Sequence, residues 1–283
     1  MFKATTLELS AERSLHLVQG GSGPDLLLVH GAVATHQDWL AGPARRLAKS
    51  YRVTIVDRPG HGLSRRPRFA GTPRDQAEQI ADGLSRVGIE RPVIAAHSFG
   101  ALVSLALAER MPERVAALVL VAPLAFPEPR LLEHSLIAPR SMPVLGPMLS
   151  RMGQGSGFDR AMLELLQATM FSPEPVPVAW KESFPYDRVL DPDRLVLEGE
   201  DCAAILPMSP AGTIDLRRVE APAHILTGTR DKVVEDERQG KALARLLPNA
   251  RLTEIEGGGH MIHHSHPDLL VSAISEAAAP ADA

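Results

Sequence analysis

A serine, an aspartate and a histidine stand where the three could act together on a carbonyl group. Ser98 lies within Ala96-His97-Ser98-Phe99-Gly100, while Asp231 and His260 come much later in the chain. A serine hydroxyl needs a base within hydrogen-bond reach to attack at neutral pH. That base in turn needs a carboxylate, which fixes its tautomer and stabilises the imidazolium that forms. Ser98, Asp231 and His260 are therefore candidates for the nucleophile, the acid and the base of an acyl transfer.

The run around Ser98 predicts a sharp turn between a strand and a helix. An apolar strand leads into it, a helical pattern follows from Ala101, and Ser98 has a small residue two positions away on each side. This small-x-Ser-x-small pattern is typical of a nucleophile elbow, where strand and helix backbones pass close together. Ala96 departs mildly from the usual glycine. Other strand-Ser-Gly-helix junctions share this pattern, so the assignment depends on partners elsewhere in the chain.

Acyl transfer also requires two donors that converge on the oxyanion of the transition state. The backbone N–H of Phe99, at the start of the predicted elbow helix, is the first candidate. The backbone N–H of Ala32, which follows His30-Gly31 at the end of an apolar strand, is the second. We expect His30 to shape the loop that carries Ala32.

Other residues compete for the acid and base roles. Asp201 and Asp236 are alternative acids, but only Asp231 comes directly after a buried strand. The alternative bases are His263, His264 and His266. His97 adjoins Ser98, but neighbouring side chains point apart in an elbow, so we expect it to pack behind the turn.

The histidine cluster also raises the question of a metal. His260 and His264 are four residues apart. No nearby carboxylate or cysteine completes a ligand set of the kind that zinc requires. We expect no metal and no other cofactor.

The elements that must position these residues alternate between strand and helix. Apolar runs predict buried strands at 26–29, 52–56, 93–97, 115–121, 224–229 and 250–255, after two antiparallel strands within 5–18. Between them lie helical patterns, one of which begins with the capping box Thr72-Pro73-Arg74-Asp75. This rhythm predicts an α/β fold with a mostly parallel sheet, whose ligands bind at the carboxyl ends of the strands.

The alternation stops at Pro123 and returns near residue 212. Prolines concentrate between these points, and short helical patterns occupy Leu131–Ile137, Phe158–Met170 and Pro192–Ile205. We therefore predict a core formed by residues 1–122 and 212–283, with an inserted helical cap at 123–211.

Composition narrows the function classes. The chain has 283 residues, a formal net charge of −4 and one cysteine, Cys202. The charge gives no reason to expect a nucleic acid or an anionic membrane as partner, and a single cysteine excludes an intramolecular disulfide. No signal-peptide core or spanning segment is visible, so we expect a cytoplasmic protein with a small-molecule substrate. The sequence leaves the oligomeric state open.

Together these motifs resemble those of the α/β-hydrolase superfamily. The matching segments are Val29-His30-Gly31-Ala32, the run from Asp57 to Ser64, Ala96–Gly100, Gly228–Asp231 and Gly258–Met261. The resemblance implies the eight-stranded α/β-hydrolase fold, a Ser98–His260–Asp231 triad, and a cap that builds the substrate pocket. Haloalkane dehalogenases and epoxide hydrolases of this superfamily use an aspartate nucleophile, so serine at position 98 argues against both chemistries.

The expected activity is carboxylesterase-like hydrolysis of a small ester or related carbonyl compound through an acyl-enzyme. One alternative on the same fold is carbon–carbon hydrolysis of a diketo acid, which needs a cationic group for the substrate carboxylate. An alternative of another class is a non-hydrolytic ligand-binding protein. The pocket candidates are His30, Trp39, Met142, Phe171, Phe184, Val233 and Met261.

Overall fold

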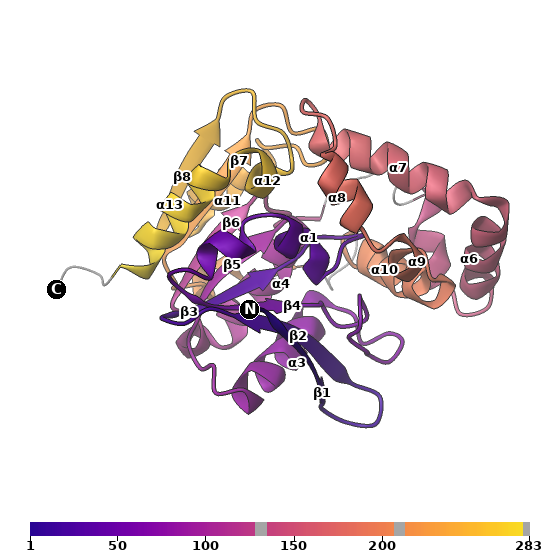
Figure 1. Cartoon of the computed structure of the whole chain (residues 1–283), viewed down its shortest axis with the longest axis horizontal. Coiled ribbons are helices and arrows are strands. Elements are labelled where there is room, and N and C mark those ends of the chain that lie inside the picture. The colour runs from indigo at the N-terminus through magenta and orange to yellow at the C-terminus, as the bar shows by residue number, and fades with distance from the viewer. Residues whose placement is uncertain (128–134, 207–212, 280–283) are drawn as a thin grey trace.

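The structure is a computed structural model that describes residues 1–127, 135–206 and 213–279. Its centre is an eight-stranded sheet with the strand order β1-β2-β4-β3-β5-β6-β7-β8 (Figure 1). The strands are β1 (Lys3–Glu8), β2 (Ser14–Gly20), β3 (Asp25–Val29), β4 (Arg52–Val56), β5 (Val93–His97), β6 (Ala117–Val121), β7 (Ala223–Gly228) and β8 (Ala250–Ile255). β2 is antiparallel to both β1 and β4, and all other pairs are parallel. The predicted mostly parallel sheet is confirmed.

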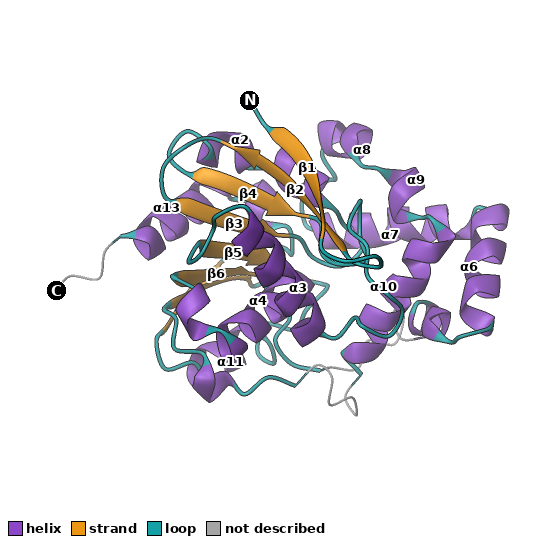
Figure 2. Ribbon diagram, turned by 90° about the horizontal axis from the view of Figure 1, so that it is seen from below, coloured by secondary structure: helices purple, strands orange, loops and turns teal. Residues whose placement is uncertain are grey.

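Helices cover both faces of this sheet, as Figure 2 shows. One face carries α3 (Pro73–Arg86), α4 (Phe99–Arg110) and α11 (Gly240–Leu246). The other face carries α1 (His36–Ala41), α2 (Ala44–Leu47), α12 (Ile262–Ser265) and α13 (Pro267–Ala278). Because both faces are covered, the central strands β3, β4, β5 and β6 are mostly apolar and buried along almost their whole length, as parallel strands in such folds are.

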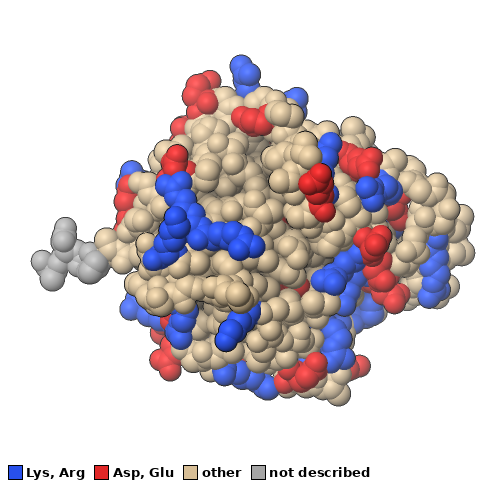
Figure 3. Space-filling model, viewed as in Figure 1, with Lys and Arg blue, Asp and Glu red and all other residues tan. Residues whose placement is uncertain are grey.

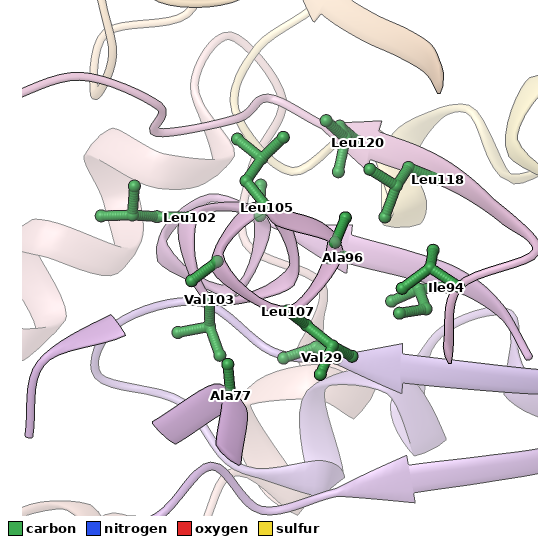
Figure 4. Close-up of a cluster of buried hydrophobic side chains, with 14 of the residues drawn as sticks. Val29, Ala77, Ile94, Ala96, Leu102, Val103, Leu105, Leu107, Leu118 and Leu120 are labelled. Atoms are coloured by element: carbon green, nitrogen blue, oxygen red, sulfur yellow. The ribbon is translucent and has the colours of Figure 1, made fainter. Parts of the chain in front are cut away.

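The helix that follows Ser98 is buried almost all round. Figure 4 shows Leu102, Val103, Leu105 and Leu107 of α4 among apolar side chains of the neighbouring strands and of α3. Each fully buried leucine of this kind contributes roughly 1.5–3 kcal/mol of transfer free energy. The helix that begins at the elbow is therefore held rigidly in the core.

The predicted capping box at the start of α3 is present. The Asp75 N–H donates to the Thr72 hydroxyl at 3.1 Å, and the Thr72 N–H donates to the Asp75 carboxylate at 3.1 Å. Both bonds satisfy backbone donors that a helix leaves free at its first turn.

Helical structure occupies the segment between β6 and β7. Among its described residues, the helices up to residue 204 are η2 (Ala138–Ser141), α6 (Leu145–Ser156), α7 (Phe158–Phe171), α8 (Val178–Ser183), α9 (Tyr186–Val189) and α10 (Pro192–Ala204). They lie beside the sheet rather than on its faces (Figure 1), and we call Ala138–Ala204 the cap. The helices expected at Phe158–Met170 and Pro192–Ile205 correspond to α7 and α10. Most of the helix expected at Leu131–Ile137, and the expected boundary at 211/212, lie outside the described residues.

Buried charges join the cap to the core. Arg58 Nη1 donates to Asp201 Oδ2 of α10 at 2.6 Å, and Arg66 Nη2 donates to Asp201 Oδ1 at 3.2 Å. Arg66 Nη1 also donates to Glu200 at 2.5 Å. Burial would raise the pKa of Asp201, but Arg58 and His61 hold it well below its usual range. Asp201 is thus an anionic anchor of the cap.

Two features of the surface bear on partners. No helix in the described part of the chain combines the length and apolar character needed to cross a membrane. Basic and acidic side chains are interspersed on the face drawn in Figure 3. That the protein binds no nucleic acid stays a prediction.

Candidate active site

Ser98 occupies a strained turn between β5 and α4. Its backbone has φ 51° and ψ −119°, a region that a residue with a side chain rarely adopts. A Cβ on Gly100 would lie 2.5 Å from the carbonyl oxygen of His30 and 2.7 Å from that of Val29. Glycine is therefore required at position 100, because the backbone at the end of β3 passes so close to it. This close approach is typical of a nucleophile elbow.

Asp231 and His260 are joined by a hydrogen bond. Asp231 follows β7, His260 follows β8, and His260 Nδ1 donates to Asp231 Oδ2 at 2.7 Å. The other carboxylate oxygen, Oδ1, accepts the N–H groups of Val233 at 2.7 Å and Val234 at 3.0 Å. A carboxylate held in this way keeps the proton on Nδ1 and leaves Nε2 free to act as a base.

Ser98 and His260 line the same cavity, which has a volume of about 340 Å³. Ala32 and Phe99, the two residues expected to donate to an oxyanion, line it as well. The cap contributes four residues of α7, namely Leu165, Leu166, Thr169 and Met170, and two of α10, namely Glu198 and Cys202. The carboxyl ends of β3, β5 and β8 thus bring the chemical groups to one side of a mostly apolar cavity, and the cap closes the other.

A second hollow on the molecule is larger but chemically different. This groove, of about 870 Å³, runs between α9 and the loop at Gly62, and neither Ser98 nor His260 lines it. The cavity at Ser98 is therefore the one to consider for catalysis.

The pocket residues expected from the sequence need correction. Of the seven candidates only Val233 lines the Ser98 cavity. Phe171, Phe184 and Met261 belong instead to an apolar cluster between cap and core that also contains Trp180. Met142 is 48% exposed on the surface. The aromatic residues chosen from the cap thus pack it against the core, whereas Leu165, Leu166 and Met170 of α7 line the cavity.

His30 and Trp39 also lie outside the cavity lining, buried in the core. His30 Nδ1 donates to the carbonyl of Gly31 at 2.8 Å, and its Nε2 accepts the N–H of Arg58 at 2.9 Å. Burial lowers the pKa of His30 to about 3, with the Arg58 charge as a second cause. The neutral ring therefore holds the loop that precedes Ala32.

The competing histidines have other partners. His97 Nε2 donates to the backbone carbonyl of His260 at 3.2 Å, so this ring supports the loop of the base. His263 and His264 donate from Nε2 to Asp38 at 3.0 and 2.8 Å. Asp38 could not be singled out from the sequence, because an acid in the first turn of a helix is common.

Two groups of buried residues have the spacing of metal ligands in the described part of the chain. They are His16, His36 and Asp57, and Asp38, His97 and His263. In the first group His36 Nδ1 donates to Asp57 at 2.9 Å, and in the second His263 donates to Asp38. These hydrogen bonds use ring nitrogens and carboxylate oxygens that a metal would need, so the expectation of no metal stays our prediction.

Comparison with known proteins identifies the family. The model of the Alpha/beta hydrolase family matches residues 26–273, and the chain belongs to that family, as the motifs predicted. A pimeloyl-[acyl-carrier protein] methyl ester esterase of Chromobacterium violaceum is 28% identical over 90% of this chain and 94% of its own length.

Two further comparisons cover different parts of the chain. A dihydrolipoyllysine-residue acetyltransferase component of the acetoin cleaving system, from Cupriavidus necator, is 38% identical over 38% of this chain. That match spans only 29% of the relative's length. The naproxen esterase of Bacillus subtilis, a solved structure, superimposes with a TM-score of 0.69 at 18% identity, over 98% of this chain and 91% of that one. At this identity the likeness shows the fold alone.

Proposed function

We propose that the protein is a serine carboxylesterase that works through an acyl-enzyme. The observation that carries this proposal is that Ser98 and His260 line one cavity while Asp231 fixes the Nδ1 proton of His260 at 2.7 Å. The full-length similarity to an enzyme named as a methyl ester esterase supports the same class of reaction.

In the proposed mechanism His260 Nε2 takes the hydroxyl proton of Ser98 as the oxygen attacks the ester carbonyl. The N–H groups of Ala32 and Phe99 stabilise the oxyanion, and the protonated His260 then gives its proton to the leaving alcohol. Water, deprotonated by His260, hydrolyses the acyl-enzyme and releases the acid. Asp231 stays ionised throughout and stabilises the imidazolium.

The cavity limits the substrate to a compact molecule with an apolar part. Its volume of about 340 Å³ lies at the small end of ligand sites. Leu165, Leu166 and Met170 supply apolar surface from one side of α7. We expect short or medium acyl esters to be better substrates than long ones.

The carbon–carbon hydrolase alternative is less well supported. It needs a cation for the carboxylate of a diketo acid, and no arginine is found among the residues that line the Ser98 cavity in the described structure. The one lysine there, Lys232, is exposed. Turnover of a diketo acid without any esterase activity would favour this alternative, and a protein that turns over no substrate repeatedly would favour the ligand-binding one.

The test is the hydrolysis of short p-nitrophenyl esters by wild type and Ser98→Ala. We expect kcat/KM to fall by roughly 10⁴-fold or more, as for other serine nucleophiles. Ser104→Ala is the matched control, because Ser104 lies on α4, the helix that follows Ser98, and donates to the backbone carbonyl of Gly100 at 2.8 Å. Equal activity in Ser98→Ala and wild type would reject the mechanism.

A further inference from the structure

One acidic side chain stands out in the lining of the Ser98 cavity. Glu198 is the only carboxylate among the described lining residues, and it is 6% exposed. It lies on α10 one turn before Cys202, which lines the same cavity. An acid in an apolar cavity is costly unless its oxygens are paired.

The protein pairs one oxygen of Glu198 but not the other. Glu198 Oε2 lies 3.2 Å from His61 Nδ1, whereas Oε1 accepts no hydrogen bond from the described residues. Some polar side-chain atoms of the described structure are both unpaired and fully enclosed, and Oε1 of Glu198 is not one of them. This oxygen is therefore both unpaired and reachable from a space beside it.

His61 holds Glu198 in place from behind. Its second nitrogen, Nε2, lies 2.9 Å from Asp201 Oδ2, so the ring stands between two carboxylates. Asp201 is itself anchored by Arg58. The carboxylate of Glu198 is thus fixed by the network that joins cap to core, which leaves its free oxygen at a defined place.

Glu198 lines the same cavity as the groups proposed to react. Val33, next to the expected oxyanion donor Ala32, lines the main cavity together with Glu198. The same two residues line two small voids beside it, of about 30 and 10 Å³. The larger void is also lined by Arg140 and Asp159 and the smaller one by Arg188 and Arg194, so a substrate group that passes Val33 meets Glu198 beside other charged side chains.

We propose that Glu198 determines specificity by accepting a hydrogen bond from a donor group of the substrate. The substrate class is an ester that carries a primary ammonium group, or a hydroxyl as a weaker donor, on the arm that extends past Val33. An ester with a carboxylate at this place is disfavoured, because its anion would face the carboxylate of Glu198. This inference rests on the proposed esterase function and adds the substrate class to it.

The experiment compares p-nitrophenyl esters that differ only at the end of the acyl chain. In these p-nitrophenyl esters, three to six methylenes separate the ester from a terminal ammonium, methyl or carboxylate group. A second set consists of acetate esters that carry the same terminal groups on the alcohol side. A charge-assisted hydrogen bond is worth enough to change kcat/KM by about tenfold or more. We expect wild type to prefer ammonium over methyl by at least that factor at one chain length, and to disfavour carboxylate.

The variants are read as ratios between substrates, so that a general loss of activity cancels. Glu198→Gln is expected to bring the ammonium-to-methyl ratio down by about tenfold and to raise the carboxylate-to-methyl ratio. Asp193→Asn is the matched control, because Asp193 lies on the same helix but is exposed and does not line the cavity. It should leave both ratios unchanged. Identical ratios in Glu198→Gln and wild type would overturn the proposal.

A second measurement needs only the wild-type protein and covers the case in which the variant does not fold. Binding of n-hexylammonium, n-hexanol and n-hexanoate is measured by calorimetry and by competition with a neutral ester. We expect hexylammonium to bind most tightly and hexanoate most weakly, and tighter binding of hexanoate would reject the role of Glu198. If wild type hydrolyses no ester but still prefers hexylammonium, the esterase function fails while the inference about Glu198 stands.

Discussion

Both carboxylate oxygens of Asp231 accept hydrogen bonds from neighbouring groups. Oδ1 accepts two backbone N–H groups, from Val233 and Val234, and Oδ2 accepts His260 Nδ1 at 2.7 Å. Because the backbone donors fix the plane of the carboxylate, only one orientation and one tautomer of His260 satisfy it. The loop after β7 therefore determines which ring nitrogen faces the cavity.

Replacing Asp231 by asparagine tests this assignment. The amide oxygen still accepts the Val233 and Val234 N–H groups, but the NH₂ then faces His260 Nδ1 and favours the tautomer with the proton on Nε2. We expect folding to be retained and kcat to fall by roughly 10³–10⁴-fold, measured with a p-nitrophenyl ester. The control is Asp236→Asn, the competing acid that lies outside the cavity lining, and it should stay near wild type. A larger loss in Asp236→Asn than in Asp231→Asn would reverse the assignment.

Among the elements, α10 and the loop after β3 share one arginine. Arg58 Nη2 donates to the carbonyl of Gly31 at 3.2 Å, in the peptide whose N–H belongs to Ala32. The same guanidinium binds Asp201 of α10 and lies over the Phe99 ring at 4.6 Å. Both expected oxyanion donors are thus in contact with a residue that also holds the cap.

Asp201→Asn should therefore destabilise the protein strongly. The substitution leaves the buried guanidinium groups of Arg58 and Arg66 without their shared anion, and breaking a buried ion pair on one side costs about 3–5 kcal/mol. Urea denaturation measures the free energy of unfolding. Glu164→Gln is the control, since Glu164 pairs with Arg160 on the exposed surface of α7 and such pairs contribute about 0–1 kcal/mol. Equal effects of the two substitutions would show that the buried network contributes no more than a surface pair.

The sequence predicts the core elements better than the cavity that they surround. Ser98 and Asp231 follow the buried strands β5 and β7, and His260 follows β8. Because these strands are parallel, their carboxyl ends meet at one edge of the sheet. Cap residues have no such rule. Met170 lines the cavity while Phe171 packs against Trp180, and only the placement of α7 relative to the core decides between these neighbours.

Some of the cavity residues that were missed could nevertheless be recognised from their spacing in the sequence. Leu165, Leu166, Thr169 and Met170 have the three- and four-residue spacing of one helix face, so one correct cavity residue in α7 would have identified the others. The contact of Arg58 with Asp201 joins residues 143 positions apart. No local pattern reveals such a contact, and Glu198 and His61 depend on it for their positions.

Across the whole molecule, the core encloses histidines that must stay neutral. His30, His97 and His263 are each at most 1% exposed. Burial is the largest cause that lowers the pKa of all three, and for His30 it brings the value to about 3. In the unfolded chain these rings regain a pKa near 6.5. The unfolded state therefore binds more protons than the native state at mildly acidic pH.

This difference predicts steep acid destabilisation. The free energy of unfolding rises with pH wherever the unfolded state binds more protons, so stability is lost as pH falls below about 6.5. Each ring that stays neutral in the native state contributes up to about 1.4 kcal/mol per pH unit, against a typical stability of about 5–15 kcal/mol. Urea denaturation at pH steps from 7 to 4.5 measures the slope, and a slope near zero would contradict the neutral state of the buried rings. His97→Gln removes one of the three groups, and we expect it to reduce the slope by about 1.4 kcal/mol per pH unit.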